Sequence, residues 1–206
     1  MLSKILLYGI IILTVFVSYN CFKSKELFYR LEFSPYRISR KKEFQRFITY
    51  GFVHADWPHL IINMFVLHSF GFVVMEVASL YFQQHHLFFL TLYFGGLIVS
   101  SIYSFFKHRN NYNYVAVGAS GAVSAVVFAS ILFYPVGSIR FFFIPFDIPA
   151  YIFGLLYLVY SAVMARRGKD NIGHDAHFFG ALFGLLFPLV LKPQLIIIFI
   201  RLVFSN

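Results

Sequence analysis

The fold of this chain depends on one apolar segment, Val115–Phe133, which reads VAVGASGAVSAVVFASILF. These 19 residues carry no charge, and about 20 apolar residues are enough to cross a hydrocarbon core of about 30 Å as a helix. The first half of the segment consists largely of Gly, Ala and Ser, which allow a second helix to approach closely within a membrane. We therefore expect a central spanning helix that is tightly packed by its neighbours.

The motif Gly118-Ala119-Ser120-Gly121 places a hydroxyl where this helix is expected to begin. The first N–H groups of a helix have no intrahelical partners and can bind an anion. The motif alone is weak, because serine is also a common packing residue in membrane helices. It does not match the nucleophile elbow of soluble hydrolases, which needs a preceding strand. Ser120 is thus a candidate nucleophile only if the chain also supplies a base.

The composition excludes most soluble classes of protein. Hydrophobic residues make up 60% of the 206 residues and charged residues only 12%, which is typical of a polytopic membrane protein. Six spans would use roughly 120 positions, leaving room for one long loop and no separate soluble domain. We therefore expect a single all-α membrane domain over residues 1–206.

The net charge of +9 is suited to anionic lipid headgroups and not to nucleic acid, because the basic residues lie between apolar spans. Cys21 is the single cysteine, which excludes an intrachain disulfide and a thiolate metal cluster.

Apolar runs predict the other spans and their ends. The six expected spans are Leu2–Tyr19, Trp57–Leu80, Leu87–Phe106, Val115–Phe133, Pro149–Ala165 and a last one from Gly173 to Lys192-Pro193. Asp56 and Pro58 make a helix start for the second span, and Asp170 or Asn171 for the sixth. The basic segment 20–50 either lies in the membrane interface or is a solvated loop. Leu195–Phe204 is too short to cross alone, so it extends the last helix or lies in the interface.

The second span carries two polar residues on one face. His59 and Asn63 are four residues apart, and residues at this spacing are neighbours on a helix. Polar groups at membrane depth are costly unless they have partners or a function. The alternative is that both residues hydrogen-bond neighbouring helices and only hold the bundle together.

The sixth span supplies a candidate base. His177, Gly180 and Gly184 share one helix face, and the two glycines allow close contact with another helix. Packing this face on the Ser120 helix would bring an imidazole to the hydroxyl. Ser120 then serves as nucleophile and His177 as general base, while His59, Asn63 and the Ser120 N–H are the donors available to an oxyanion. Asp175 points away from the His177 face, which indicates a dyad and not a triad.

The order of these motifs resembles the rhomboid intramembrane serine proteases. The resemblance rests on three motifs, which are His54 with His59-x-x-x-Asn63, Gly118-x-Ser120-Gly121 and Ala176-His177-x-x-Gly180. It covers about residues 45–190 and implies a six-helix bundle with a water-accessible cavity. It also implies the same roles for Ser120, His177, His59 and Asn63. His54, Gly118, Gly121 and Gly180 would line the site.

The resemblance further implies the partners of the protein. The expected substrates are single-pass membrane proteins whose helices unwind locally. Neither a cofactor nor a metal ion is required, and the remaining partners are membrane lipids. We expect a multi-pass protein of the bacterial inner (plasma) membrane.

The chain departs from the family pattern in three places. Ser124 stands where many members carry an aromatic residue that stacks on the histidine, which leaves His177 without that stacking partner. The Trp-Arg pair often found in the first loop is missing, although Arg46 lies in a comparable region. Glu76 follows Gly71 by five residues instead of four.

Two other classes of function remain open on the sequence. The rhomboid fold includes inactive relatives that bind membrane proteins without cutting them, but these typically lack the serine or the histidine. A metal or proton transporter would use His54, His59, His174 and His177. It would lack an acidic ligand pair, and the His-Glu-x-x-His motif is absent from the sequence.

Overall fold

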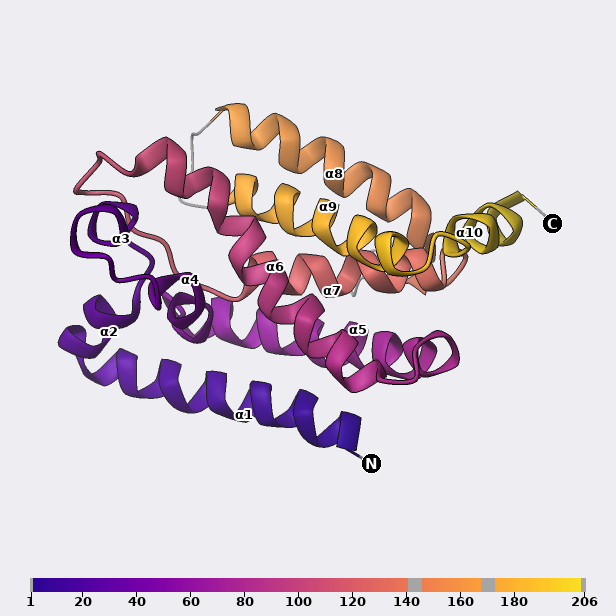
Figure 1. The fold of residues 1–206 in the computed structure, drawn as a ribbon, viewed down its shortest axis with the longest axis horizontal. Coiled ribbons are helices and arrows are strands. Elements are labelled where there is room, and N and C mark those ends of the chain that lie inside the picture. Colours follow the sequence, from indigo (N-terminus) through magenta and orange to yellow (C-terminus); the bar gives the residue numbers. More distant parts are fainter. Residues whose placement is uncertain (1, 141–145, 168–172, 205–206) are drawn as a thin grey trace.

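The computed structural model describes residues 2–140, 146–167 and 173–204, and within these ranges the protein is helical apart from one short hairpin. The main helices run back and forth along one axis (Figure 1), namely α1 (Leu2–Lys23), α5 (Trp57–Tyr81), α6 (His85–His108), α7 (Ser120–Phe133), α8 (Ala150–Arg167) and α9 (His174–Leu191). The start of α1 and the last helix of the chain, α10 (Leu195–Phe204), lie at the same end of this bundle. The expected all-α bundle is confirmed.

The apolar runs predicted most spans correctly. Among the described helices, α1, α5, α6 and α9 are long and apolar enough to cross a membrane. Asp56 caps α5 as expected, since its carboxylate accepts a hydrogen bond of 2.8 Å from the His59 N–H. Asp170 and Asn171 lie outside the described residues, and the residue that precedes α9 is Gly173.

The central helix begins within the expected motif but is shorter than the apolar run. α7 starts at Ser120 and has 14 residues, whereas the expected span Val115–Phe133 has 19 residues. Gly118 has a φ of +114°, in the region that favours glycine and interrupts a helix. Ala116 pairs with Phe33 of the first loop through two backbone hydrogen bonds of 2.9 and 3.0 Å. Residues 115–119 therefore form a non-helical entry to α7, and Ala116 ties it to the first loop.

The consequence is a short, enclosed helix. A helix of 14 residues is about 21 Å long, which is less than the hydrocarbon core of about 30 Å. Every residue from Gly121 to Phe133 is buried. In Figure 1, α6 and the short helices of the first loop extend past the point where α7 begins. Ser120 thus lies inside the bundle and not at its end.

The basic first loop is folded. It contains α2 (Lys25–Leu31), α3 (Pro35–Lys41), α4 (Arg46–Thr49) and a single turn of 3₁₀ helix, η1 (Tyr50–Phe52). Arg46 is only 1% exposed, and its guanidinium donates to the carbonyls of Tyr29 (3.1 Å) and Glu32 (2.5 Å). It also forms an ion pair of 2.5 Å with Glu43. Arg46 therefore joins three parts of the loop.

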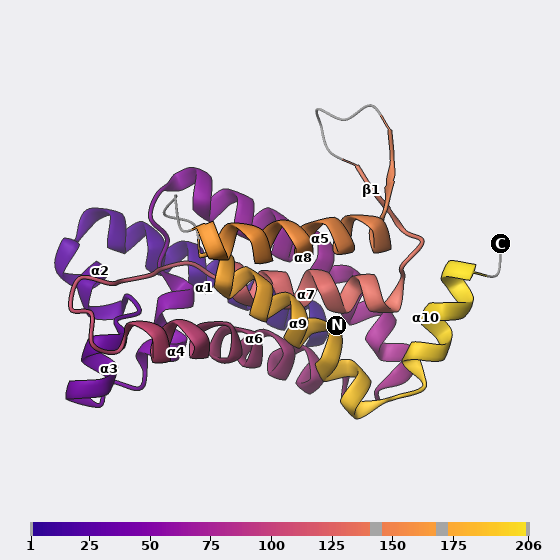
Figure 2. The same cartoon turned by 90° about the horizontal axis from the view of Figure 1, so that it is seen from above.

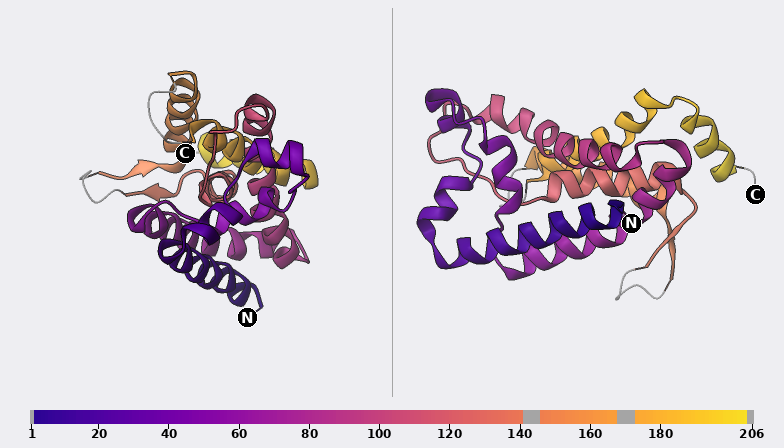
Figure 3. Two further views of the ribbon diagram at one scale, coloured as in Figure 1. Left: turned by 90° about the vertical axis from the view of Figure 1, so that its left-hand side faces the viewer. Right: turned by 60° about the horizontal axis from the view of Figure 1, so that its bottom comes forward.

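Two elements lie outside the bundle. The strands β1 (Ser138–Ile139) and β2 (Ile148–Pro149) pair antiparallel and project from the body beyond the C-terminal end of α7 (Figure 2). The last helix, α10 (Leu195–Phe204), follows a turn after α9 and points in a different direction (Figure 3). Leu195–Phe204 is therefore a separate helix and not an extension of α9.

Candidate active site

The site is built on the contact between α7 and α9. A Cβ atom added to Gly180 would overlap with the carbonyl oxygen of Gly121, and one added to Gly184 would overlap with that of Ala125. The two backbones therefore touch directly, as the small-residue faces predicted. Ser120 is adjacent to Gly121, and His177 lies one turn before Gly180.

Helix geometry thus brings Ser120 and His177 to the same end of one interface. Both residues are partly exposed. Within the described ranges, no hydrogen bond joins the two side chains. Such bonds between catalytic groups often form only when substrate is bound.

His59 lies against the turn that precedes Ser120. A Cβ on Gly118 would stand 2.6 Å from Cε1 and 2.8 Å from Nε2 of the His59 ring. Only glycine fits here, both for space and for its positive φ. The sequence-predicted residues His59, Gly118 and Ser120 are therefore neighbours in space.

Asn63 lies one turn further along the same face of α5. Its side-chain nitrogen donates to the His59 carbonyl at 2.9 Å, and the residue is 6% exposed. One amide N–H is thus used within α5. The second N–H and the amide oxygen remain for partners in the site.

His54 connects α1 to the segment that carries Ser120. Its Nε2 accepts from the Ala119 N–H at 3.4 Å, so Nδ1 is the protonated nitrogen and donates to Ser18 Oγ at 3.0 Å. The Ser18 hydroxyl in turn donates to the Phe52 carbonyl at 2.8 Å. The His54 ring also packs edge-on against His59 at a centroid distance of 4.9 Å. His54 therefore holds the backbone beside Ser120, and both of its ring nitrogens are used for this.

Asp175 faces away from the site. One carboxylate oxygen accepts from Ser104 Oγ of α6 at 2.8 Å, and the other accepts from the Ala176 N–H at 2.9 Å. This agrees with the prediction from helical spacing that Asp175 does not share the His177 face. The carboxylate links α9 to α6 instead.

Tyr157 of α8 was missed by the sequence interpretation. Its ring is nearly parallel to that of His177, with an interplanar angle of 25° and a centroid distance of 6.3 Å. Its hydroxyl is 2.8 Å from the Ser124 hydroxyl. His177 therefore has an aromatic neighbour despite the serine at position 124. The spacing along α7 carries no signal for it, because the ring comes from another helix.

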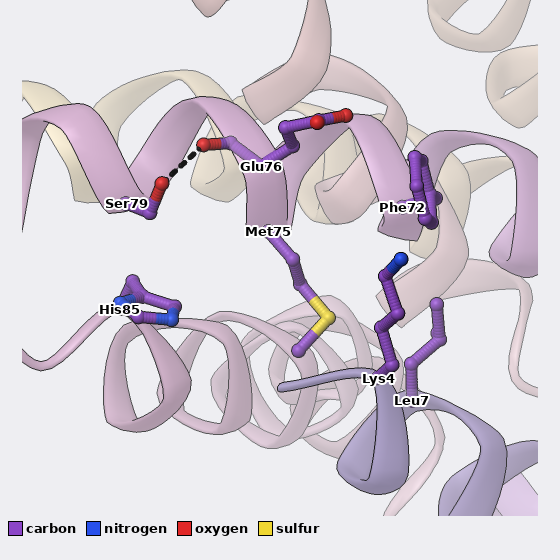
Figure 4. A pocket seen from close by; sticks show the side chains of 7 residues that line it. All are labelled: Lys4, Leu7, Phe72, Met75, Glu76, Ser79 and His85. Atoms are coloured by element: carbon purple, nitrogen blue, oxygen red, sulfur yellow. Dashed lines mark hydrogen bonds between the residues drawn. The ribbon is translucent and has the colours of Figure 1, made fainter. Parts of the chain in front are cut away.

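A separate pocket lies at the other end of α5 (Figure 4). Its volume is about 170 Å³ and its lining residues are Lys4, Leu7, Phe72, Met75, Glu76, Ser79 and His85. Glu76 is 17 residues after His59, which is about 25 Å along a helix. The pocket is therefore not part of the Ser120 site. Within the described residues, no group of three or more His, Cys, Asp and Glu side chains is placed to hold a metal ion.

Comparisons with known proteins identify relatives of the chain. A family model described as Rhomboid domain matches residues 41–194. RHOMBOID-like protein 12, mitochondrial, from Arabidopsis thaliana is 29% identical over 150 residues, which are 65% of this chain and 42% of that protein. The chain thus spans less than half of this relative. The relative is mitochondrial by name, so the expected bacterial inner membrane has no support from the comparisons.

Proposed function

Because the chain belongs to the rhomboid family, we propose that it is an intramembrane serine endopeptidase with a Ser120–His177 dyad. Its substrates would be the transmembrane segments of single-pass membrane proteins, and membrane lipids would surround it. The protein itself is a multi-pass integral membrane protein, as its apolar helices and its family indicate.

The direct contact between the backbones of α7 and α9 is the observation that carries the proposal. It depends on Gly121 and Gly180. Ser120 and His177, which are 57 residues apart in the sequence, flank these glycines at the same end of the interface. A bundle that served only for packing would not need a serine at the first position of α7 beside a histidine. The short length of α7 supports the same conclusion, because a helix of 14 residues does not cross a hydrocarbon core of about 30 Å, so that a hydroxyl at its first position would lie below the membrane surface.

The proposed reaction follows from these groups. The neutral His177 imidazole takes the proton of Ser120 Oγ as the oxygen attacks the scissile carbonyl, and an oxyanion forms on the carbonyl oxygen. His177 then returns the proton to the leaving amine. A water molecule, deprotonated by the same imidazole, then attacks the acyl-enzyme. The imidazolium returns this proton to Ser120 Oγ as the ester bond breaks and the second product leaves. No cofactor is required for these steps.

The developing oxyanion needs preorganised donors. The Ser120 N–H is at the N-terminus of α7 and has no intrahelical partner. His59 packs against Gly118 beside it, and Asn63 lies on the same face of α5. Loss of one such donor costs up to about 10²–10³ in turnover in other serine proteases.

The decisive experiment compares Ser120→Ala, His177→Ala and the double variant with wild type, each purified in detergent with a model single-pass substrate. The three variants should be about equally inactive, because the two groups act as one unit. A serine-directed fluorophosphonate should label wild type, fail on Ser120→Ala and label His177→Ala much more slowly. Folding should persist, since Ser120→Ala keeps a small residue at a small-residue face.

The proposal is wrong if Ser120→Ala cleaves at the wild-type rate in a preparation free of other proteases. A non-catalytic membrane-protein binder makes the opposite prediction, that wild type neither cleaves the substrate nor reacts with the fluorophosphonate.

A further inference from the structure

An aromatic ring from a third helix, α8, lies beside His177, the proposed base. On α7, the residues one turn after Ser120 are Val123 and Ser124, so α7 itself provides no aromatic side chain near His177. The nearly parallel ring beside the imidazole belongs to Tyr157 of α8. Its centroid distance of 6.3 Å falls within the range of offset aromatic pairs.

Tyr157 is held in this position on three sides. Its hydroxyl is hydrogen-bonded to the Ser124 hydroxyl at 2.8 Å, and its ring packs on Phe128 of α7 at 5.5 Å and Phe153 of α8 at 5.8 Å. One turn before it, Gly154 is buried against Ile131 of α7, where a Cβ would already be 3.1 Å from the Ile131 side chain. Close packing of α8 on α7 therefore fixes where the Tyr157 ring lies.

Ser124 is suited to this arrangement in size and chemistry. A larger side chain at position 124 would meet the Tyr157 hydroxyl, which lies 2.8 Å from the Ser124 oxygen. A hydroxyl leaves that space open and supplies a hydrogen-bond partner for the phenol, which satisfies two polar groups in a largely apolar setting.

We propose that Tyr157 is a positioning residue for His177, held by its hydrogen bond to Ser124. The ring limits the rotation of the imidazole and keeps it directed toward Ser120 without touching the reacting atoms. This inference rests on the proposed peptidase function and adds to it the group that orients the base.

The test measures kcat, KM and the rate of fluorophosphonate labelling for Tyr157→Leu, Tyr157→Phe and Ser124→Ala in full-length protein. Tyr157→Leu removes the ring and should lower kcat and the labelling rate about tenfold, at the upper end of what one aromatic pair contributes, while KM stays within about twofold. Tyr157→Phe keeps the ring and should recover most of this loss. A role in packing alone would not lower kcat at constant KM.

The hydrogen bond is tested by a double-mutant cycle. Tyr157→Phe and Ser124→Ala each remove the same bond, so the double variant should be no slower than either single variant. The matched control is Ser130→Ala, because Ser130 is also buried on α7 but donates to the Val127 carbonyl of its own helix. Ser130→Ala should leave kcat unchanged.

The outcomes separate the two proposals. If wild type is active and Tyr157→Leu has the same kcat, the role of Tyr157 is refuted and the peptidase proposal stands. A Tyr157→Phe variant as slow as Tyr157→Leu has the same consequence. A wild type that neither cleaves nor reacts with the fluorophosphonate overturns the peptidase function and, with it, this inference. If Tyr157→Leu fails to fold, the cycle of Tyr157→Phe and Ser124→Ala decides, and fully additive losses overturn the proposal.

Discussion

The contact between α7 and α9 can be tested by adding one methyl group. In Gly180→Ala the new Cβ would overlap with the carbonyl oxygen of Gly121, which is backbone and cannot rotate away. The two helices must therefore separate by on the order of 1 Å, and overpacking of this kind costs about 1–3 kcal/mol of unfolding free energy. A displacement of about 1 Å between reacting groups can lower turnover about 10²-fold.

The measurements are the cleavage rate of a model substrate and thermal unfolding in detergent, followed by circular dichroism. Gly184→Ala meets the Ala125 carbonyl two turns after His177, so we expect a similar loss of stability but a smaller loss of turnover. The control is Gly9→Ala in α1, where no other atom lies within 4 Å of the added Cβ. That substitution should leave turnover unchanged and stabilise the helix by about 0.5–1 kcal/mol. Wild-type stability together with wild-type turnover in Gly180→Ala would refute the direct contact of the two backbones.

Three further predictions concern the oxyanion donors, the first loop and the topology. His59→Ala and Asn63→Ala should each lower turnover by up to about 10²–10³ with substrate binding nearly intact, and unchanged turnover in both single variants and the double would remove these residues from the mechanism. Arg46→Ala should lower the unfolding free energy by about 3 kcal/mol, because it leaves buried polar partners unpaired. Burial raises the pKa of Glu43, but hydrogen bonds and charges from Arg46 and Arg37 hold this pKa below its usual value. The stability from these ion pairs is therefore complete above the usual glutamate pKa and is lost as the pH falls through the lowered one. Arg46→Ala should weaken this acid dependence in thermal unfolding measured against pH, and the part that comes from Arg37 should remain. The family resemblance places residues 20–50 on the extracytoplasmic side. Segments 20–50, 107–113 and 166–171, which that topology puts on one side, hold 13 of the 17 Lys and Arg residues, and the positive-inside rule would place that side in the cytoplasm. We expect thiol labelling to find 20–50 outside, and labelling from the cytoplasm would reverse this topology.

Most of the helices could be predicted from the sequence because their causes are local. The length and apolarity of each run decide whether a helix can cross a membrane, and Asp56 caps α5 through an amide three residues away. The spacing of His177, Gly180 and Gly184 predicted both the helix face and its close contact, since helical periodicity alone places these residues together. The candidate pair Ser120 and His177 followed from the same reasoning.

The tertiary structure decided the features that depend on distant partners. The apolar run gave no sign that residues 115–119 leave the helix, because the backbone partner of Ala116 is Phe33 in the first loop. The hydrogen bonds of His54 join it to Ser18 and Ala119, which are 36 and 65 residues away. Tyr157 reaches His177 from α8 because close packing on α7 sets the position of that helix. Local patterns determine which segments are helices and which helix faces are polar or suited to close packing. The choice of partner across the bundle depends on how all the helices pack at once.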